Sequence, residues 1–173
     1  MKRIIKWIFG GGKTIVVEKE EIMQILFHRG RMLLLDQVTI TDGKVIGEFT
    51  VPAENCVGHE PIPNMPVMRG VEIVEMAFQL LGIIVAKNPE LAAMLKGKAA
   101  AAREITNAKF SGFIRPGDKL VLETGTEVDV DEMAGTAKIE SSRMVAKLDG
   151  KKKGMVASVS IAVFDPSLIN QSE

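Results

Sequence analysis

Two residues near the middle of the chain have types and spacing suited to acid–base chemistry. His59 follows Gly58 in a proline-rich segment, and a neutral imidazole can accept a proton near neutral pH. Glu75 comes sixteen residues later within an apolar stretch, where burial favours the protonated carboxyl group. Such a pair could remove one proton from a substrate and donate another to it.

Gly70 stands at the expected start of the helix that carries Glu75. The first N–H groups of a helix lack intrahelical acceptors, and glycine lets a ligand come close, so Gly70 could donate to a developing oxyanion. A base, an acid and an oxyanion donor suit removal of a proton next to a thioester or another carbonyl, with loss of a β-hydroxyl group. The alternative is that His59 is an ordinary loop histidine and Glu75 a hydrogen-bonded core carboxyl group.

The spacing of apolar residues predicts a helix from Gly70 to Lys87. Its apolar positions recur at intervals of three and four residues: Val71, Val74, Phe78, Leu81 and Val85. Other apolar residues cover the remaining sides, and a helix that is apolar nearly all round is buried. Gln79 lies one turn after Glu75, so its amide can hydrogen-bond to the carboxyl group and orient it. Glu72 points to a different side and is expected to be solvated or paired.

The rest of the sequence predicts an antiparallel sheet against that helix, and thus an α+β fold. An amphipathic helix is expected over residues 18–26, followed by a hairpin with strands at 32–40 and 45–51. The segment 52–69 has four prolines and no helical period, which is typical of a functional loop. A short helical turn is expected at 91–95. Four long segments separated by turn sequences then read as strands: 99–109, 119–130, 134–148 and 152–164.

The composition favours one neutral, apolar domain in a reducing compartment. The chain has 173 residues, 22 Lys plus Arg, 22 Asp plus Glu, 46% hydrophobic residues and one cysteine, Cys56. Zero net charge argues against a nucleic-acid surface and fits self-association, while a single cysteine cannot form an intramolecular disulfide. No apolar run is long enough to span a membrane, and we expect no membrane contact and a cytoplasmic location. Residues 1–17 are interpreted as a tail with a glycine linker, 18–166 as the domain and 167–173 as a second tail.

Three separated segments resemble a known family when taken in order. The first runs from Gly58 to Gln79 and has a Gly-His pair, a turn that ends at Gly70, and then Glu75 and Gln79. The others are residues 21–36 and 109–120. Together they resemble the hot-dog-fold 3-hydroxyacyl-[acyl-carrier-protein] dehydratases of bacterial fatty acid synthesis, over about residues 18–165.

The resemblance implies a hot-dog fold, in which a long antiparallel sheet wraps around a central helix. It also implies a homodimer with two shared active sites, which could assemble further as a trimer of dimers. His59 would face the partner subunit's Glu75 along a tunnel for the acyl–phosphopantetheine arm. By that likeness His59 removes the α-proton, Glu75 protonates or holds the departing hydroxyl group, and the Gly70 N–H polarises the thioester carbonyl.

The resemblance also implies which groups contact the substrate. Gln79, Met68 and Val67 would orient or bind it, and Met68 could line a flexible acyl channel. No metal or redox cofactor is implied, because the substrate is carried on the phosphopantetheine of acyl carrier protein, which is favoured over coenzyme A. His28, in the second segment, is expected to shape its loop.

Departures from the family pattern leave alternatives open. The loop after His59 is two residues longer, and Arg69 replaces a proline before Gly70. The alternatives are another hot-dog enzyme, such as a thioesterase or a dehydratase that also isomerises the double bond, or a catalytically silent acyl-thioester-binding protein. Arg69, Arg115 and the lysine run 151–153 could meet an acidic carrier protein. A Cys56–His59 nucleophile is disfavoured because nothing orients the pair.

Overall fold

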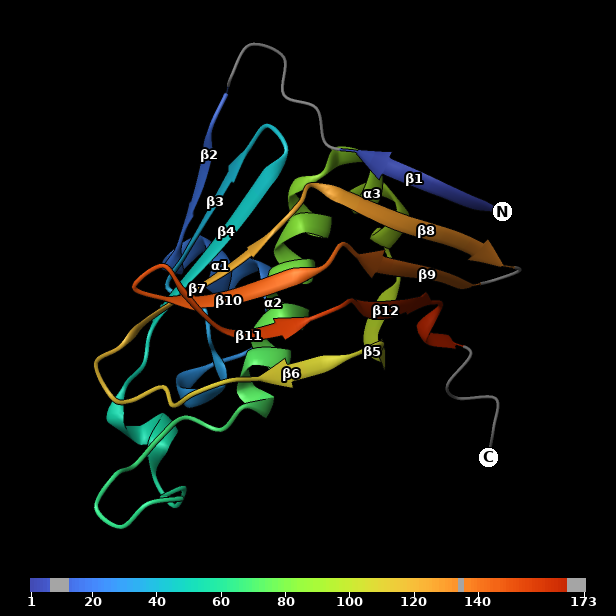
Figure 1. Cartoon of the computed structure of the whole chain (residues 1–173). Helices are drawn as coiled ribbons and strands as arrows, with labels where there is room; N and C mark the ends of the chain where they lie inside the picture. The colour runs from blue at the N-terminus through green and yellow to red at the C-terminus, as the bar shows by residue number, and fades with distance from the viewer. Residues whose placement is uncertain (7–12, 134–135, 168–173) are drawn as a thin grey trace.

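The computed structural model describes residues 1–6, 13–133 and 136–167, which form an α+β fold with antiparallel strands crossing one long helix (Figure 1). That helix, α2 (Val71–Lys87), begins one residue after its predicted start and ends where predicted. Eleven of its 17 residues are buried, which confirms the expectation from its nearly continuous apolar surface. Among the described residues, no helix is long and apolar enough to cross a membrane.

The four predicted long strands are extended, but each contains two strands separated by a short break. In chain order these strands are β5 (Ala99–Ile105), β6 (Ala108–Phe110), β7 (Lys119–Thr124), β8 (Glu127–Met133), β9 (Thr136–Ser141), β10 (Met144–Leu148), β11 (Lys151–Val156) and β12 (Val159–Phe164). On one side of the breaks the order is β8-β9-β12-β5, and on the other it is β7-β10-β11-β6. Because each long strand keeps its neighbours across the break, the two sheets form one antiparallel strip that bends around α2.

Polar groups satisfy the backbone where the strip bends. The Ser142 hydroxyl donates to the Glu127 carbonyl at 2.7 Å, and the Ala157 N–H donates to the Asn107 carbonyl at 2.7 Å. An unpaired backbone group at a buried bend would destabilise the fold, so these contacts allow the sheet to curve without losing hydrogen bonds. The curvature places α2 against the concave face of the strip.

The remaining elements extend the strip and close its ends. They are β2 (Ile15–Glu18), α1 (Lys19–Ile25), β3 (Gln37–Thr41), β4 (Lys44–Thr50), α3 (Pro89–Leu95) and the 3₁₀ helices Gly30–Met32 and Ala53–Cys56. The predicted hairpin is confirmed at residues 37–50, whereas residues 32–36, expected to start its first strand, lie outside β3. Gly47 in β4 allows close packing on α2, since an added methyl group would lie 2.8 Å from Leu35 and 3.1 Å from Leu80.

The interpretation of residues 1–17 as a tail is wrong at two places. β1 (Lys2–Lys6) pairs with β8, and β2 pairs with β3. Arg3 fixes β1 further, because its guanidinium contacts Glu132 at 2.8 Å and also Glu90 in α3. The expected glycine linker at 10–12 and the end of the expected C-terminal tail at 168–173 lie outside the described residues.

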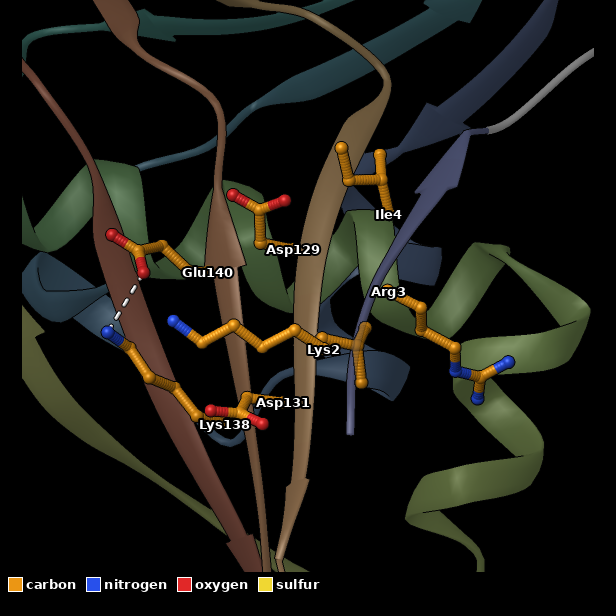
Figure 2. Close-up of a pocket in the computed structure, with 8 residues that line it drawn as sticks. Lys2, Arg3, Ile4, Asp129, Asp131, Lys138 and Glu140 are labelled. Atoms are coloured by element: carbon orange, nitrogen blue, oxygen red, sulfur yellow. Dashed lines mark ion pairs between the residues drawn. The ribbon is translucent and has the colours of Figure 1, made fainter.

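A shallow charged hollow lies on the outer face of the sheet beside β1. It measures about 580 Å³, and Figure 2 shows Lys2 and Ile4 facing it, with Arg3 directed away toward α3. Lys138 pairs with Glu140 in its wall at 2.8 Å. Its charged side chains are of both signs, as expected for a solvated sheet face.

Candidate active site

A single oxygen of the Glu75 carboxyl group is in contact with the side chains of Gln79 and His28. Glu75 Oε1 accepts from Gln79 Nε2 at 3.0 Å and lies 3.0 Å from His28 Nε2. Gln79 is itself anchored, because its Nε2 also donates to the Met32 carbonyl at 2.7 Å and its Oε1 accepts from the Leu34 N–H at 2.9 Å. The hydrogen bond between Gln79 and Glu75 that the spacing predicts is present.

Glu75, His28 and Gln79 lie in the wall of a cavity of about 630 Å³. The rest of the wall is mainly apolar and comes from the end of α1, from α2, α3, β5 and β12. Its members include Ile25, Phe78, Val85, Leu95 and Ile161. A mostly apolar cavity with few polar groups in its wall suits a ligand with a hydrocarbon chain and one reactive polar end.

The expectation that Glu75 is buried is wrong, whereas Glu72, expected to be solvated or paired, is paired and nearly buried. The Glu75 side chain is 33% exposed, whereas the Glu72 side chain is only 11% exposed and pairs with Arg69 at 2.7 Å. The reason is the direction of the helix face. Val71, 62% exposed, and half-buried Phe78 share the Glu75 face, which faces the cavity instead of the sheet.

His59 lies in the loop before α2 and is fixed by backbone contacts. Its Nδ1 is 3.0 Å from the Val67 carbonyl, and the Val67 N–H donates back to the His59 carbonyl at 3.0 Å. A carbonyl can only accept, so the neutral imidazole carries its hydrogen on Nδ1, and Nε2 is left as an acceptor. This is the tautomer that a general base needs.

The structure of one chain does not bring every candidate residue together. His59 is not among the residues that line the Glu75 cavity, and neither are Val67 and Met68, which are 1% and 4% exposed. Val67 acts through its carbonyl on His59, and the Met68 N–H donates to the Ile114 carbonyl at 2.9 Å. His28, expected only to shape its loop, is instead in contact with Glu75.

Gly70 precedes α2 and is covered on one side by an aromatic ring. A methyl group added at Gly70 would lie 2.8 Å from ring atoms of Phe110, so no larger residue fits without moving that ring. None of the hydrogen bonds among the described residues uses the Gly70 N–H. This donor is therefore available at the helix N-terminus, as the sequence predicts.

The buried Cys56 thiol is unsuited to nucleophilic attack. Burial raises its pKa, and the negative charges of Glu72 and Asp118 add to this effect. The thiol therefore stays protonated at neutral pH, which agrees with the prediction against a Cys56–His59 nucleophile. Among the described ranges, no group of three or more His, Cys, Asp or Glu side chains is arranged to hold a metal ion.

Comparisons with known proteins identify the relatives of the chain. The model of the FabA-like domain matches residues 26–157. The 3-hydroxyacyl-[acyl-carrier-protein] dehydratase FabZ of Ligilactobacillus salivarius is 36% identical over 137 residues, which is 76% of this chain and 89% of that protein. FabZ of Bacillus velezensis is 33% identical, over 79% of this chain and 91% of that protein.

Solved structures resemble the fold at lower sequence identity. An inactive mutant of the CurJ dehydratase matches with a TM-score of 0.59 and 18% identity, over 89% of this chain and 50% of that one. The fluoroacetyl-CoA thioesterase FlK matches with a TM-score of 0.51 and 15% identity, over 75% of this chain and 91% of that one. The fold is the hot-dog fold, with a long central helix wrapped by antiparallel strands.

Proposed function

The chain belongs to the FabA-like family, and on this premise we propose that it dehydrates 3-hydroxyacyl-[acyl-carrier-protein] to trans-2-enoyl-[acyl-carrier-protein] in fatty acid biosynthesis. The observation that carries the proposal is the Glu75 carboxyl group, which accepts a hydrogen bond from Gln79 and contacts His28 in the wall of a mainly apolar cavity. The names of the FabZ relatives specify this reaction for those proteins.

The proposed reaction consists of two proton transfers and the loss of water. His59 Nε2 takes a proton from C2, and the electrons of that C–H bond form the C2=C3 double bond. The C3–O bond breaks as Glu75 gives its proton to the departing hydroxyl group, which leaves as water. The Gly70 N–H stabilises the negative charge on the thioester oxygen. Proton return from His59 to Glu75 through solvent completes the cycle, and no step needs a metal or redox group.

A homodimer with shared sites is part of the proposal. β5 ends the strand order, and its side chains are largely exposed, so its free edge can pair with another strand. The exposed Glu75 face of α2 also needs a cover. We therefore propose that two copies associate beside β5 and that His59 reaches the partner subunit's Glu75. This arrangement would supply the base that is missing from the Glu75 cavity of one chain.

Basic residues near the start of α2 support acyl carrier protein as the partner. Arg69 is half exposed beside Gly70, and Lys109 and Lys153 lie on β6 and β11 next to Phe110, whose ring covers Gly70. These positive charges suit an acidic carrier surface and the phosphate of its prosthetic group. Because the whole chain has no net charge, recognition must depend on this local patch. A cytoplasmic location stays a prediction that rests on the single cysteine.

A crotonyl thioester provides the direct test. Loaded on acyl carrier protein, it should be hydrated to the 3-hydroxybutyryl thioester, seen as loss of the enoyl ultraviolet absorbance, and the reaction should reach the same equilibrium from the hydroxy side. Release of free thiol without hydration would instead identify a thioesterase. Binding of the carrier with no turnover would leave only a binding protein, and either result would overturn the proposal.

A further inference from the structure

We propose that His28 is a positioning residue for Glu75, and that it determines which carboxyl oxygen carries the reacting proton. This inference rests on the proposed function, because it assigns His28 a part in the same reaction. His28 would not touch the reacting atoms. Its imidazole would hold Glu75 Oε1, so that Oε2 presents the proton to the substrate hydroxyl group.

The contact between the two side chains joins separate elements. His28 lies in the loop after α1, Glu75 lies on α2, and Nε2 and Oε1 are 3.0 Å apart. The His28 side chain is 17% exposed, and its ring stacks on Phe27 with centroids 4.3 Å apart. This geometry gives the imidazole little freedom to turn away from the carboxyl group.

Arg29 fixes the backbone that carries His28. Its guanidinium donates to the carbonyls of Leu26, His28 and Met23, with distances of 2.7 and 2.6 Å for the first two. Three contacts from one side chain hold the loop against the end of α1. The loop that carries His28 is thus fixed at the end of α1, and the contact with Glu75 ties the helix face to this loop.

The surroundings of His28 determine its tautomer. Nδ1 is buried and has no hydrogen-bond partner among the described residues. A hydrogen on Nδ1 would be a buried donor without an acceptor, which is costly, whereas an unprotonated Nδ1 leaves only a lone pair. The ring is therefore assigned as neutral with its hydrogen on Nε2, and it donates to Glu75.

Two donors on Oε1 have a consequence for the proton of the carboxyl group. Gln79 and His28 both occupy Oε1, and neither contact uses Oε2. The oxygen that accepts both hydrogen bonds is the carbonyl oxygen of the neutral acid, so the hydroxyl hydrogen is on Oε2. When the C3–O bond breaks, this Oε2–H transfers to the leaving oxygen, and the resulting carboxylate keeps both donors.

The two donors act differently. Gln79 is one turn from Glu75 on the same helix, and its hydrogen bond limits rotation of the Glu75 carboxyl group. His28 approaches from another element and fixes the carboxyl group relative to the cavity. Loss of His28 should therefore lower kcat while leaving KM nearly unchanged, since substrate binding does not depend on which oxygen carries the proton.

The test compares His28→Leu with His28→Gln by steady-state hydration of a crotonyl thioester on acyl carrier protein. Leucine removes the donor, and we expect kcat to fall roughly 10- to 100-fold, as for loss of a hydrogen bond to an ionisable group. Glutamine can place an amide N–H near the Nε2 position and should recover kcat to within about threefold of wild type. Gln37→Leu removes a donor to Glu18 outside the site and should leave kcat unchanged.

Wild-type kcat in His28→Leu, or a His28→Gln variant as slow as His28→Leu, would overturn the inference. Thermal unfolding of each variant checks that it is folded. If His28→Leu does not fold, His28→Gln is compared with His28→Asn, whose shorter side chain should not reach Glu75 and should give the lower kcat.

A double-mutant cycle adds a second readout. In a Glu75→Gln background, His28→Leu should cause no further fall in kcat, because the proton that His28 positions is already gone. A further fall of about tenfold would contradict the inference. Failure of the proposed function itself looks different, since wild-type protein would then show no hydration at all.

Discussion

Glu72 and Glu75 are three residues apart on α2, and the difference in their surroundings explains their different roles. Glu72 is nearly buried and pairs with Arg69, which compensates its charge. Glu75 shares a face with exposed Val71, and Gln79 and His28 hold its Oε1 in the wall of the cavity. A carboxyl group in a cavity can meet a ligand, whereas a carboxyl group closed in by an ion pair cannot.

The role of Glu75 gives a prediction at the residue scale. Glu75→Gln keeps the size and the hydrogen-bonding capacity of the side chain but has no acidic proton. We expect kcat for crotonyl thioester hydration to fall by about 10²- to 10⁴-fold, with an unchanged unfolding temperature.

Glu72→Gln on the same helix provides the matched control. It should lower the unfolding temperature, because it weakens the pair with Arg69, and it should retain most of the activity of the folded protein. Near-wild-type kcat in Glu75→Gln would contradict the assignment of Glu75 as the acid.

At the scale of elements, the bent strip explains how a short chain surrounds a 17-residue helix. Each long strand crosses the bend with its neighbours, so the curvature is shared by all four strands. β1 adds a further strand beside β8, and it lies outside the segment that matches the family model. None of the residues that line the Glu75 cavity comes from β1. We therefore expect β1 to contribute to the stability of the fold and not to the site.

Two neighbouring isoleucines in β1 test this assignment. Ile5 is 6% exposed and packs in the core, whereas Ile4 is 69% exposed. Ile5→Ala should lower the free energy of unfolding by about 2 kcal/mol, measured by urea denaturation, because it leaves a cavity. Ile4→Ala should change it by less than about 0.5 kcal/mol.

Both isoleucine variants should retain wild-type kcat under conditions where they are folded. Equal effects of the two substitutions on stability would show that β1 does not pack on the core. A selective loss of activity in Ile5→Ala would mean that β1 contributes to the site.

At the scale of the whole molecule, the proposed shared site accounts for the separation of His59 from the Glu75 cavity within one chain. His59 has its Nδ1 fixed by the Val67 carbonyl, but it does not line the cavity that contains Glu75. The free edge of β5 and the exposed α2 face lie where a partner could close the site. The high apolar content of the sequence, 46%, fits a protein that buries surface in a dimer as well as in a core.

Mixing two inactive variants tests the shared site. His59→Ala and Glu75→Gln should each be inactive as homodimers. When the two are unfolded, mixed and refolded together, half of the dimers are mixed, and each mixed dimer has one intact site. We therefore expect about a quarter of the wild-type activity. No recovery, with dimers confirmed by light scattering, would show that each site is built within one subunit.

The sequence by itself determined the elements whose patterns are local. The 3.6-residue period of residues 70–87 specified α2, and the turn sequences at 115–118 and 149–151 separated strands, although the turn expected at 131–132 lies within β8. The spacing of Glu75 and Gln79 fixed their hydrogen bond, since residues four apart on a helix are neighbours. Ordered motifs around His59, Gly70 and Glu75 also indicated the family.

Only the tertiary structure decided which groups meet across separate elements. The contact of His28 with Glu75, the pairing of β1 with β8 and the bend shared by four strands depend on long-range packing, which no local period encodes. Long-range packing also determines that Glu72 is nearly buried and Glu75 is not. Both residues lie on one apolar helix, and only the position of the sheet decides which helix face is covered. Local spacing specifies which residues can share a helix face, and tertiary packing determines what that face contacts.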